Sequence, residues 1–105
     1  MTKFTVRFTV PASRELRNIA EYIATNPYDP NPEAAIEQIK RIRSAAESLS
    51  TLATVLRVRK RDSKGRQLRQ FPVNNYVLIY YVDEGKEIVR ILHVFYSGRN
   101  IDSLI

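Results

Sequence analysis

The strongest hydrophobic pattern in the chain lies within residues 76–96. Apolar and aromatic residues fill 76–82, and a second largely apolar run occupies 87–96 after the polar segment 83–86. Two strand-like runs separated by a short polar segment with a glycine indicate a β-hairpin. Neither run alternates cleanly between apolar and polar residues, so we expect both faces of the hairpin to be covered near its middle. The hairpin leads at its end to three candidate functional residues: Ser97, Gly98 and Arg99.

The N-terminal part of the chain changes from a two-residue period to a helical one. Apolar residues alternate with polar ones from Lys3 to Val10, which predicts a half-exposed strand. Pro11 ends that strand and can stand near the start of a helix, where its missing N–H is harmless. Across residues 12–24 the apolar side chains form one helical stripe, made of Leu16, Ile19, Ala20 and Ile23.

A second helix is expected after the proline-rich segment 26–32, which cannot continue a helix. Asn31 is a suitable N-cap, with Pro32 at the first helical position and Glu33 in the first turn. The apolar residues that follow form a narrow seam suited to lying along another helix: Ala35, Ile39, Ile42, Ala46, Leu49 and Ala53. Two helices with a short connection predict an antiparallel helical hairpin.

Between the second helix and the central hairpin the chain is mostly polar. We expect residues 55–61 to form an extended basic arm and residues 62–65 to form a turn. Residues 66–71 predict a short strand that Pro72 limits, and the two asparagines at 74–75 make the turn into the hairpin.

The order of these elements is β-α-α-β-β-β. It predicts an α+β fold in which a two-helix antiparallel hairpin packs on one face of a four-stranded, mainly antiparallel sheet. Because the helix pair separates the first strand from the others, that strand must join an edge of the sheet or insert beside the last strand. With 105 residues and no internal repeat, residues 1–105 are expected to form a single domain.

The composition excludes several classes of site. A chain that is 44% hydrophobic and 27% charged is typical of a folded protein. The absence of cysteine excludes disulfides, thiol chemistry and cysteine-based zinc sites, and a single histidine, His93, excludes a histidine-rich metal site. The alternating N-terminus differs from the continuous apolar core of a signal peptide, and no apolar run approaches the length of a membrane span. We therefore expect a soluble, cytoplasmic protein without a metal or other cofactor.

The net charge of +6 is concentrated in one segment. Residues 57–69 hold seven basic residues and one acidic residue, Asp62, while the rest of the chain has equal numbers of basic and acidic residues. The seven basic residues are Arg57, Arg59, Lys60, Arg61, Lys64, Arg66 and Arg69. Such a block suits a polyanion or an acidic protein partner, and a solvated loop kept soluble by its charge is the open alternative.

Few residues of the chain are candidates for catalysis. Ser97 has no base near it in sequence, and His93 lies in an apolar run, where a packed strand residue is the better interpretation. The segment 97–99 lacks the length of a glycine-rich phosphate loop. What remains is basic and aromatic, and arginines beside exposed aromatic rings can clamp phosphates and stack on bases. These residues are the 57–69 block, Arg99, Tyr76, Tyr80, Tyr81 and Tyr96, although tyrosines inside the strands are expected to be mostly core.

Two stretches, together with the order of elements, resemble a known family. LRQFPVNNYVLIYYV and EIVRILHVFYSGRNIDSLI are similar to the RelE/ParE superfamily of type II toxin–antitoxin toxins. The shared motif is a tyrosine that opens an apolar strand, a polar turn, a second strand that ends in a small residue and an arginine, and a short Leu/Ile tail. The resemblance covers essentially the whole chain and implies the fold expected above.

The superfamily has two main activities, which the resemblance implies as alternatives here. RelE-like members cut mRNA in the ribosome with clustered basic residues and a tyrosine, whereas ParE-like members poison DNA gyrase. Where the nucleases have a basic residue after the strand-opening tyrosine, this chain has Val77, and a tyrosine near the C-terminus would fall at or beyond Ile105. Arg99 alone matches the nuclease set, where it would stabilise the charge on the phosphate without a metal. No residue stands out that would move the 2′-OH proton.

The ParE-like pattern fits better, through residues 71–76, Arg99 and the tail 102–105. It departs from the family at Tyr96, where many relatives have histidine, and at Asn100, where many have aspartate. The resemblance implies a toxin that inhibits DNA gyrase without catalysis of its own, arrests growth and serves plasmid stabilisation. A cognate antitoxin would neutralise it in a hetero-oligomer, and the basic block, Tyr96 and Arg99 are the expected binding residues.

Two other functions stay open. The first is a metal-independent endoribonuclease that acts on the ribosome and mRNA, with Arg99 as its catalytic residue. The second is a nucleic-acid-binding domain without toxicity, which the local charge of residues 57–69 allows.

Overall fold

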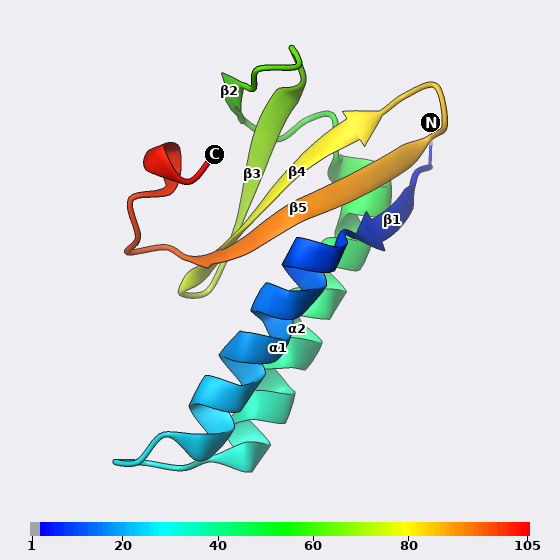
Figure 1. Ribbon diagram of the computed structural model, residues 1–105. Helices are drawn as coiled ribbons and strands as arrows, with labels where there is room; N and C mark the ends of the chain where they lie inside the picture. The colour runs from blue at the N-terminus through cyan, green and yellow to red at the C-terminus, as the bar shows by residue number, and fades with distance from the viewer. Residues whose placement is uncertain (1–2) are drawn as a thin grey trace.

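The structure is a computed structural model that describes residues 3–105 (Figure 1). Met1 and Thr2, which begin the alternating N-terminal stretch, lie outside the described residues. The elements in chain order are β1 (Thr5–Phe8), α1 (Val10–Thr25), α2 (Pro32–Leu52), β2 (Val58–Arg61), β3 (Gln67–Val73), β4 (Tyr76–Asp83), β5 (Ile88–Tyr96) and the short 3₁₀ helix η1 (Ile101–Ser103).

The strands form one sheet in the order β1-β5-β4-β3-β2. β2 to β5 are antiparallel to their neighbours, and β1 pairs in parallel with β5 at the edge of the sheet. Figure 1 shows α1 and α2 side by side, with their connecting loop projecting beyond the sheet. The predicted α+β class, the helical hairpin and the place of the first strand beside the last are confirmed.

The sheet has five strands and not the four expected, because the basic arm after α2 is itself a strand. β2 pairs with β3, with Val58 opposite Arg69 and Arg61 opposite Gln67. An edge strand tolerates charged residues, since one side of it faces solvent and its charges hinder pairing with other chains. The sequence VRKR of β2 holds a single apolar residue, so no alternation of apolar and polar residues revealed the strand.

Pro72 lies inside β3 and not at its end. Its neighbour in β4 is Val77, and on the other side the pairing with β2 reaches only as far as the bond from the Gln70 N–H to the Arg57 carbonyl (3.2 Å). Beyond that bond the outer side of β3 is an open edge, where a proline that lacks an N–H costs no sheet hydrogen bond.

Each α-helix begins at a side-chain cap. Thr9 Oγ1 accepts a hydrogen bond from the Ala12 N–H (3.3 Å), and Asn31 Oδ1 accepts one from the Ala34 N–H (3.0 Å). The predicted cap at Asn31 is confirmed. The cap at Thr9 starts α1 one residue before Pro11, so the first strand ends earlier than its alternating pattern suggested.

The central hairpin is covered on both faces, as its lack of alternation predicted. On one face its buried residues pack against the helices, and this cluster includes Ala12, Leu16, Ile42, Ala46, Leu49, Leu78, Tyr80, Val89, Ile91 and Val94. On the other face Leu68, Val77, Ile79 and Phe95 pack against Ile101 of the C-terminal tail. Burying one such aliphatic side chain contributes about 1.5–3 kcal/mol, so the two clusters dominate the stability of the fold.

Among residues 3–105, neither helix combines the length and the apolar character that a membrane crossing requires.

Candidate functional site

The basic segment, residues 57–69, holds several of its arginines in contacts within the fold. Arg59 Nε donates to Asp102 Oδ1 (2.8 Å), and its Nη1 donates to Gln70. This ion pair ties β2 to η1 in the C-terminal tail. The hydrogen bond from Arg59 lowers the pKa of the Asp102 carboxyl below its usual value, so the pair is charged near neutral pH.

The turn that follows β2 is closed by Asp62. Its carboxylate accepts bonds from the backbone N–H groups of Lys64 (3.0 Å) and Arg66 (2.9 Å) and from Arg66 Nε (2.6 Å). Burial raises the pKa of Asp62, but these hydrogen bonds outweigh it and leave the pKa below the usual value. The Arg66 guanidinium also lies 4.5 Å from the centre of the Tyr81 ring, a cation–π contact. Gly65 allows the turn, since its φ is +79°.

Other cations of the segment bind backbone carbonyls. Arg61 Nη1 donates to the Gly65 carbonyl (3.0 Å), and Arg69 Nη1 donates to the Leu56 carbonyl (2.5 Å). Within residues 3–105, three basic side chains of the segment make neither an ion pair nor a hydrogen bond: Arg57, Lys60 and Lys64. The segment is therefore partly a structural element: residues 58–61 of the expected extended basic arm are extended as β2, and Arg59 and Arg61 bond within the fold.

A second group of predicted residues meets at the other end of β4. Tyr96 and Arg99 lie with Tyr76 and Tyr22 around a hollow of about 220 Å³, and we call these four residues the tyrosine–arginine cluster. The rings of Tyr76 and Tyr96 are 6.1 Å apart and tilted by 53°. Burial, together with the neighbouring tyrosines, raises the pKa of Tyr76, so its hydroxyl stays neutral.

The cluster and the basic segment do not form one site. Arg66 and Arg69 line a separate hollow of about 300 Å³ with Tyr81 and Glu84. Tyr76 opens β4 and Tyr81 lies near its end, so the two hollows are at opposite ends of that strand. Of the tyrosines considered as binding residues, Tyr80 is fully buried core, as expected, whereas Tyr96 is 53% exposed.

His93 has a partner that the sequence did not reveal. Its Nδ1 lies 3.2 Å from the Glu15 carboxylate, and its ring stacks on Phe95 with 4.6 Å between the ring centres. Glu15 also accepts a hydrogen bond from the Val94 N–H (3.0 Å). β1 pairs with β5 only as far as Ile91. Beyond that residue, the carboxylate of Glu15 in α1 takes the place of a strand neighbour by accepting the hydrogen bond from β5. His93 is thus a packed strand residue that helps α1 to bind the sheet.

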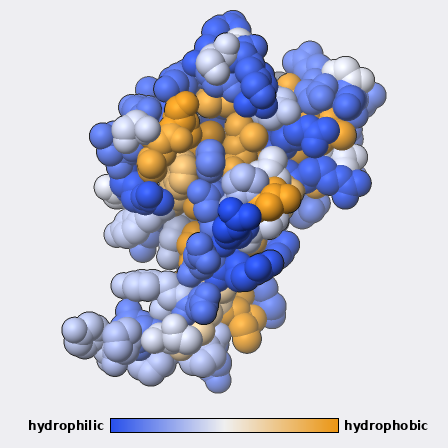
Figure 2. Space-filling model, in the orientation of Figure 1, coloured by the Kyte–Doolittle hydropathy of each residue, from blue (hydrophilic) through white to orange (hydrophobic). Residues whose placement is uncertain are grey.

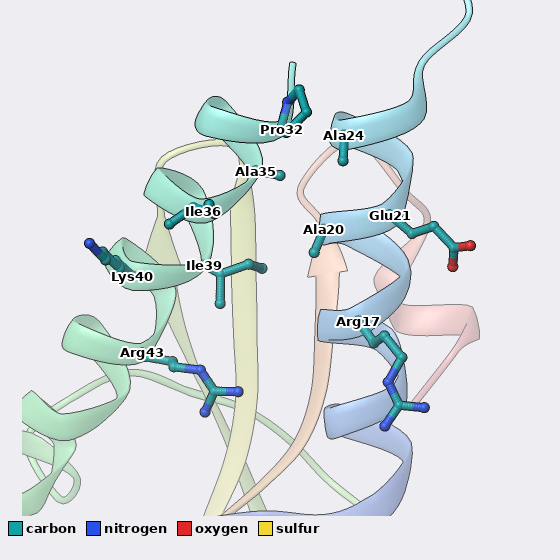
Figure 3. Close-up of a pocket in the computed structure, with 10 residues that line it drawn as sticks. All are labelled: Arg17, Ala20, Glu21, Ala24, Pro32, Ala35, Ile36, Ile39, Lys40 and Arg43. Atoms are coloured by element: carbon teal, nitrogen blue, oxygen red, sulfur yellow. The ribbon is translucent and has the colours of Figure 1, made fainter. Parts of the chain in front are cut away.

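A further hollow is a groove between the two helices, with a volume of about 720 Å³ (Figure 3). Figure 3 shows Ala20 and Ala24 of α1 and Ala35 and Ile39 of α2 around the space between the helices. Ile36, which is 58% exposed, adds to this apolar lining. The charged residues that line the groove are Arg17, Glu21, Lys40 and Arg43, three cations and one anion.

The sequence did not indicate this groove or the whole of the tyrosine–arginine hollow. Ala20 and Ala35 are expected on the stripes by which the helices pack, and nothing in their spacing distinguishes a closed seam from an open groove. Tyr22 was missed because it comes from a helix 54 residues before the strand-opening Tyr76. A large apolar residue outside the helix seam, such as Ile36, was the one available signal.

No group of three or more His, Asp or Glu side chains suited to a metal ion occurs in the part of the chain that the structure describes.

Comparison with known proteins extends the resemblance. Residues 6–101 match the family model of the ParE toxin of type II toxin–antitoxin system, parDE. No curated protein sequence matches the chain significantly.

Several solved structures share the fold. The chromosomal ParDE TA system from P. aeruginosa has a TM-score of 0.69 at 18% identity, over 90% of this chain and 96% of that one. The toxin–antitoxin complex RelBE2 from Mycobacterium tuberculosis has a TM-score of 0.61 at 22% identity, over 90% and 99%. The archaeal RelE–RelB complex from Pyrococcus horikoshii OT3 has a TM-score of 0.61 at 16% identity, over 93% and 99%.

These structures are similar in fold, and the family model covers most of the chain. The resemblance to the RelE/ParE superfamily and the preference for its ParE branch are confirmed. The chain belongs to the ParE toxin family of type II toxin–antitoxin systems.

Proposed function

We propose that this chain is the toxin of a toxin–antitoxin pair and that it arrests growth in the cytoplasm by inhibiting DNA gyrase. The family match over residues 6–101 carries this proposal. In this function the toxin binds its target and leaves the DNA chemistry to the gyrase itself, so it needs no catalytic residue of its own.

The position after the strand-opening tyrosine supports binding over RNA cleavage. Metal-independent cleavage of RNA needs a group that moves the 2′-OH proton. The RelE-like nucleases have a basic residue at this position, and here it is Val77, which is 4% exposed and packs beneath the C-terminal tail. A valine buried in the core neither moves a proton nor reaches a substrate.

A supercoiling assay with the folded, antitoxin-free chain and purified gyrase tests the proposal. We expect loss of supercoiling and accumulation of cleaved DNA at micromolar toxin, and reversal of both when antitoxin is added. Full supercoiling at that concentration would contradict the proposal. Primer extension on translated mRNA after induction tests the RelE-like alternative. Discrete cuts within codons would identify translated mRNA, and not gyrase, as the target.

We further propose that an acidic, amphipathic helix of the antitoxin lies in the groove between α1 and α2. The ParDE and RelBE structures with this fold are toxin–antitoxin complexes. The groove offers an apolar floor and an excess of two positive charges along its rim, which suits a helix with one apolar face and acidic flanks. A second copy of this chain suits it less, because two rims with the same excess of positive charge repel each other.

Growth with and without the antitoxin gene separates these toxin proposals from a nucleic-acid-binding domain without toxicity. We expect arrest by the chain alone and normal growth when the antitoxin is expressed with it. Normal growth in both cultures, with folded protein in the cells, would leave nucleic-acid binding as the better proposal.

A further inference from the structure

The tyrosine–arginine cluster brings together side chains from three elements and the segment after β5. Tyr22 comes from α1, Tyr76 opens β4, Tyr96 ends β5, and Arg99 follows in the next turn. The hollow between them is also lined by Glu15 and Asn18 of α1, and Ile19 and Val94 complete the lining. Two of the aromatic rings stay open to solvent, since Tyr22 is 67% and Tyr96 is 53% exposed.

Among the residues that the structure describes, Arg99 has no anionic partner, unlike Arg59 and Arg66 of the basic segment. Within residues 3–105 no carboxylate lies within ion-pair distance of it, whereas Arg59 and Arg66 each pair with an aspartate. Its guanidinium lies 5.3 Å from the centre of the Phe95 ring, a contact that orients it and leaves its N–H donors free. Glu15, the acidic residue among those that line the hollow, is engaged by the Val94 N–H and by His93.

Packing of α1 on the sheet explains why an aromatic side chain stands at Tyr76, which is partly buried against the helix-facing core. It does not explain two exposed aromatic rings beside a cation with free donors. Exposed aromatic faces stack on nucleobases whatever their sequence, and a guanidinium binds phosphate oxygens through two parallel hydrogen bonds.

We propose that the tyrosine–arginine cluster binds one unpaired nucleotide of a single-stranded nucleic acid. Its base stacks on Tyr96 and Tyr22, its phosphate binds Arg99, and the Asn18 amide is placed to meet the edge of the base. A duplex does not fit this site, because its bases are already stacked and their faces are covered. The net charge of +6 draws a polyanion to the protein, and the cluster provides the place where a base is held.

This site goes beyond the proposed function and does not depend on gyrase as the target. The test is fluorescence anisotropy of a labelled oligothymidine, an oligouridine of equal length and a DNA duplex, each titrated with the purified full chain at low salt. Variants Tyr96→Leu and Tyr22→Leu remove one aromatic face each and keep apolar bulk. Arg99→Gln removes the charge.

We expect each tyrosine variant to weaken single-strand binding about tenfold and to leave duplex binding unchanged. Arg99→Gln is expected to lower the slope of log affinity against log salt concentration by about 0.7, the loss of one phosphate contact on a single strand. The matched controls are Tyr28→Leu, an exposed tyrosine of the helix connection, and Arg41→Gln, an exposed arginine of α2. Both are outside the hollow and should bind as the unmodified chain does.

Wild-type affinity in both tyrosine variants would overturn the proposal, as would a loss confined to Arg99→Gln, because charge alone would then explain the binding. Failure to bind either oligonucleotide would overturn it too. Tighter binding of oligothymidine would identify DNA as the source of the nucleotide, and tighter binding of oligouridine would identify RNA. A chain that binds oligonucleotide and leaves gyrase active contradicts the proposed function and not this site.

Discussion

The basic segment and the groove between α1 and α2 both carry an excess of positive charge, but they hold their cations in different ways. In the segment, Arg59, Arg66 and Arg69 donate hydrogen bonds to acceptors of the same chain. Along the groove, Arg17 and Lys40 form no such contact with any residue from 3 to 105, and Arg43 makes only a cation–π contact with Phe8.

The difference shows that the density of charge in a sequence does not identify a binding surface. A guanidinium that is already bonded to a carboxylate or carbonyl must lose that contact before it can bind a partner. A cation beside an apolar floor binds without such a loss. Figure 2 shows hydrophilic residues over much of one face of the molecule, with an apolar area over the sheet, so exposed charge by itself is common on this surface.

The largest effect is expected when the bonded arginines of the segment are removed together. Arg59→Ala, Arg66→Ala and Arg69→Ala in one chain should lower the free energy of unfolding by about 2–4 kcal/mol, because each substitution removes hydrogen bonds within the fold. Urea denaturation followed by circular dichroism measures this change.

The control is the trio without such contacts. Charge reversal of Arg57, Lys60 and Lys64 to glutamate should change the unfolding free energy by less than about 1 kcal/mol and slow association with an acidic antitoxin at low salt. Equal stability loss in the two triple variants would break the distinction between bonded and free cations. Replacing Arg59, Lys60 and Arg61 together would mix the two classes, since Arg59 holds the tail and Arg61 holds the turn.

The next effect concerns the groove. Ile36→Glu places a negative charge in the apolar lining and should weaken antitoxin binding by about 2 kcal/mol, about thirtyfold, with stability unchanged. Val55→Glu is the matched control, because Val55 is 72% exposed and lies outside the groove. Isothermal titration calorimetry with the cognate antitoxin compares the two. Equal affinity for both variants would place the antitoxin helix elsewhere.

The fold was predictable where a hydrophobic period and a packing surface agree. The strands from Tyr76 and the helix begun by Asn31 follow from residues that are adjacent in sequence. β2 was not predictable in this way, because an edge strand of mostly charged residues has no apolar period, and its pairing with β3 is what makes it a strand.

The candidate sites were less predictable than the fold, for a physical reason. The positions of Tyr96 and Arg99 could be predicted from the end of the hairpin. Their neighbours Tyr22 and Asn18 come from α1 and meet them only through the packing of that helix on β5. Likewise, the partner of Arg59 is Asp102, 43 residues later. Contacts between distant segments depend on tertiary structure, and no spacing in the sequence encodes them directly.

A smaller effect is expected at Tyr80, and the pKa of its hydroxyl tests whether the Arg69 guanidinium lies inside the fold. The buried Tyr80 hydroxyl donates to the Ala53 carbonyl (2.8 Å), so Tyr80→Phe should cost about 1–2 kcal/mol of unfolding free energy. Burial raises the pKa of Tyr80 to about 12, although the nearby charge of Arg69 acts in the opposite direction. The folded chain therefore holds this proton more tightly than the unfolded chain, and the associated stability is present below pH 10 and lost as the pH rises toward 12. Ultraviolet titration should show a still higher pKa of Tyr80 in Arg69→Ala, and an unchanged one would mean that Arg69 points to solvent.

The smallest effect is expected at the tail, where a bonded cation of the segment meets an exposed acid. The hydrogen bond from Arg59 lowers the pKa of Asp102, so the unfolded chain binds this proton more readily than the folded chain does. The contribution of the pair is therefore complete above the usual aspartate range and is lost as the pH falls through the lowered pKa. In Asp102→Asn this pair should no longer contribute to the loss of unfolding free energy in acid. The remaining loss, to which Asp62 contributes through its own lowered pKa, should persist. Hydrogen exchange of the Leu104 and Ile105 amides, which bond to the Ile101 carbonyl, reports the tail directly and should be faster in the variant. Unchanged exchange would show that Ile101, buried on the sheet, holds the tail without the ion pair, and that even a bonded arginine of the basic segment is available to a partner.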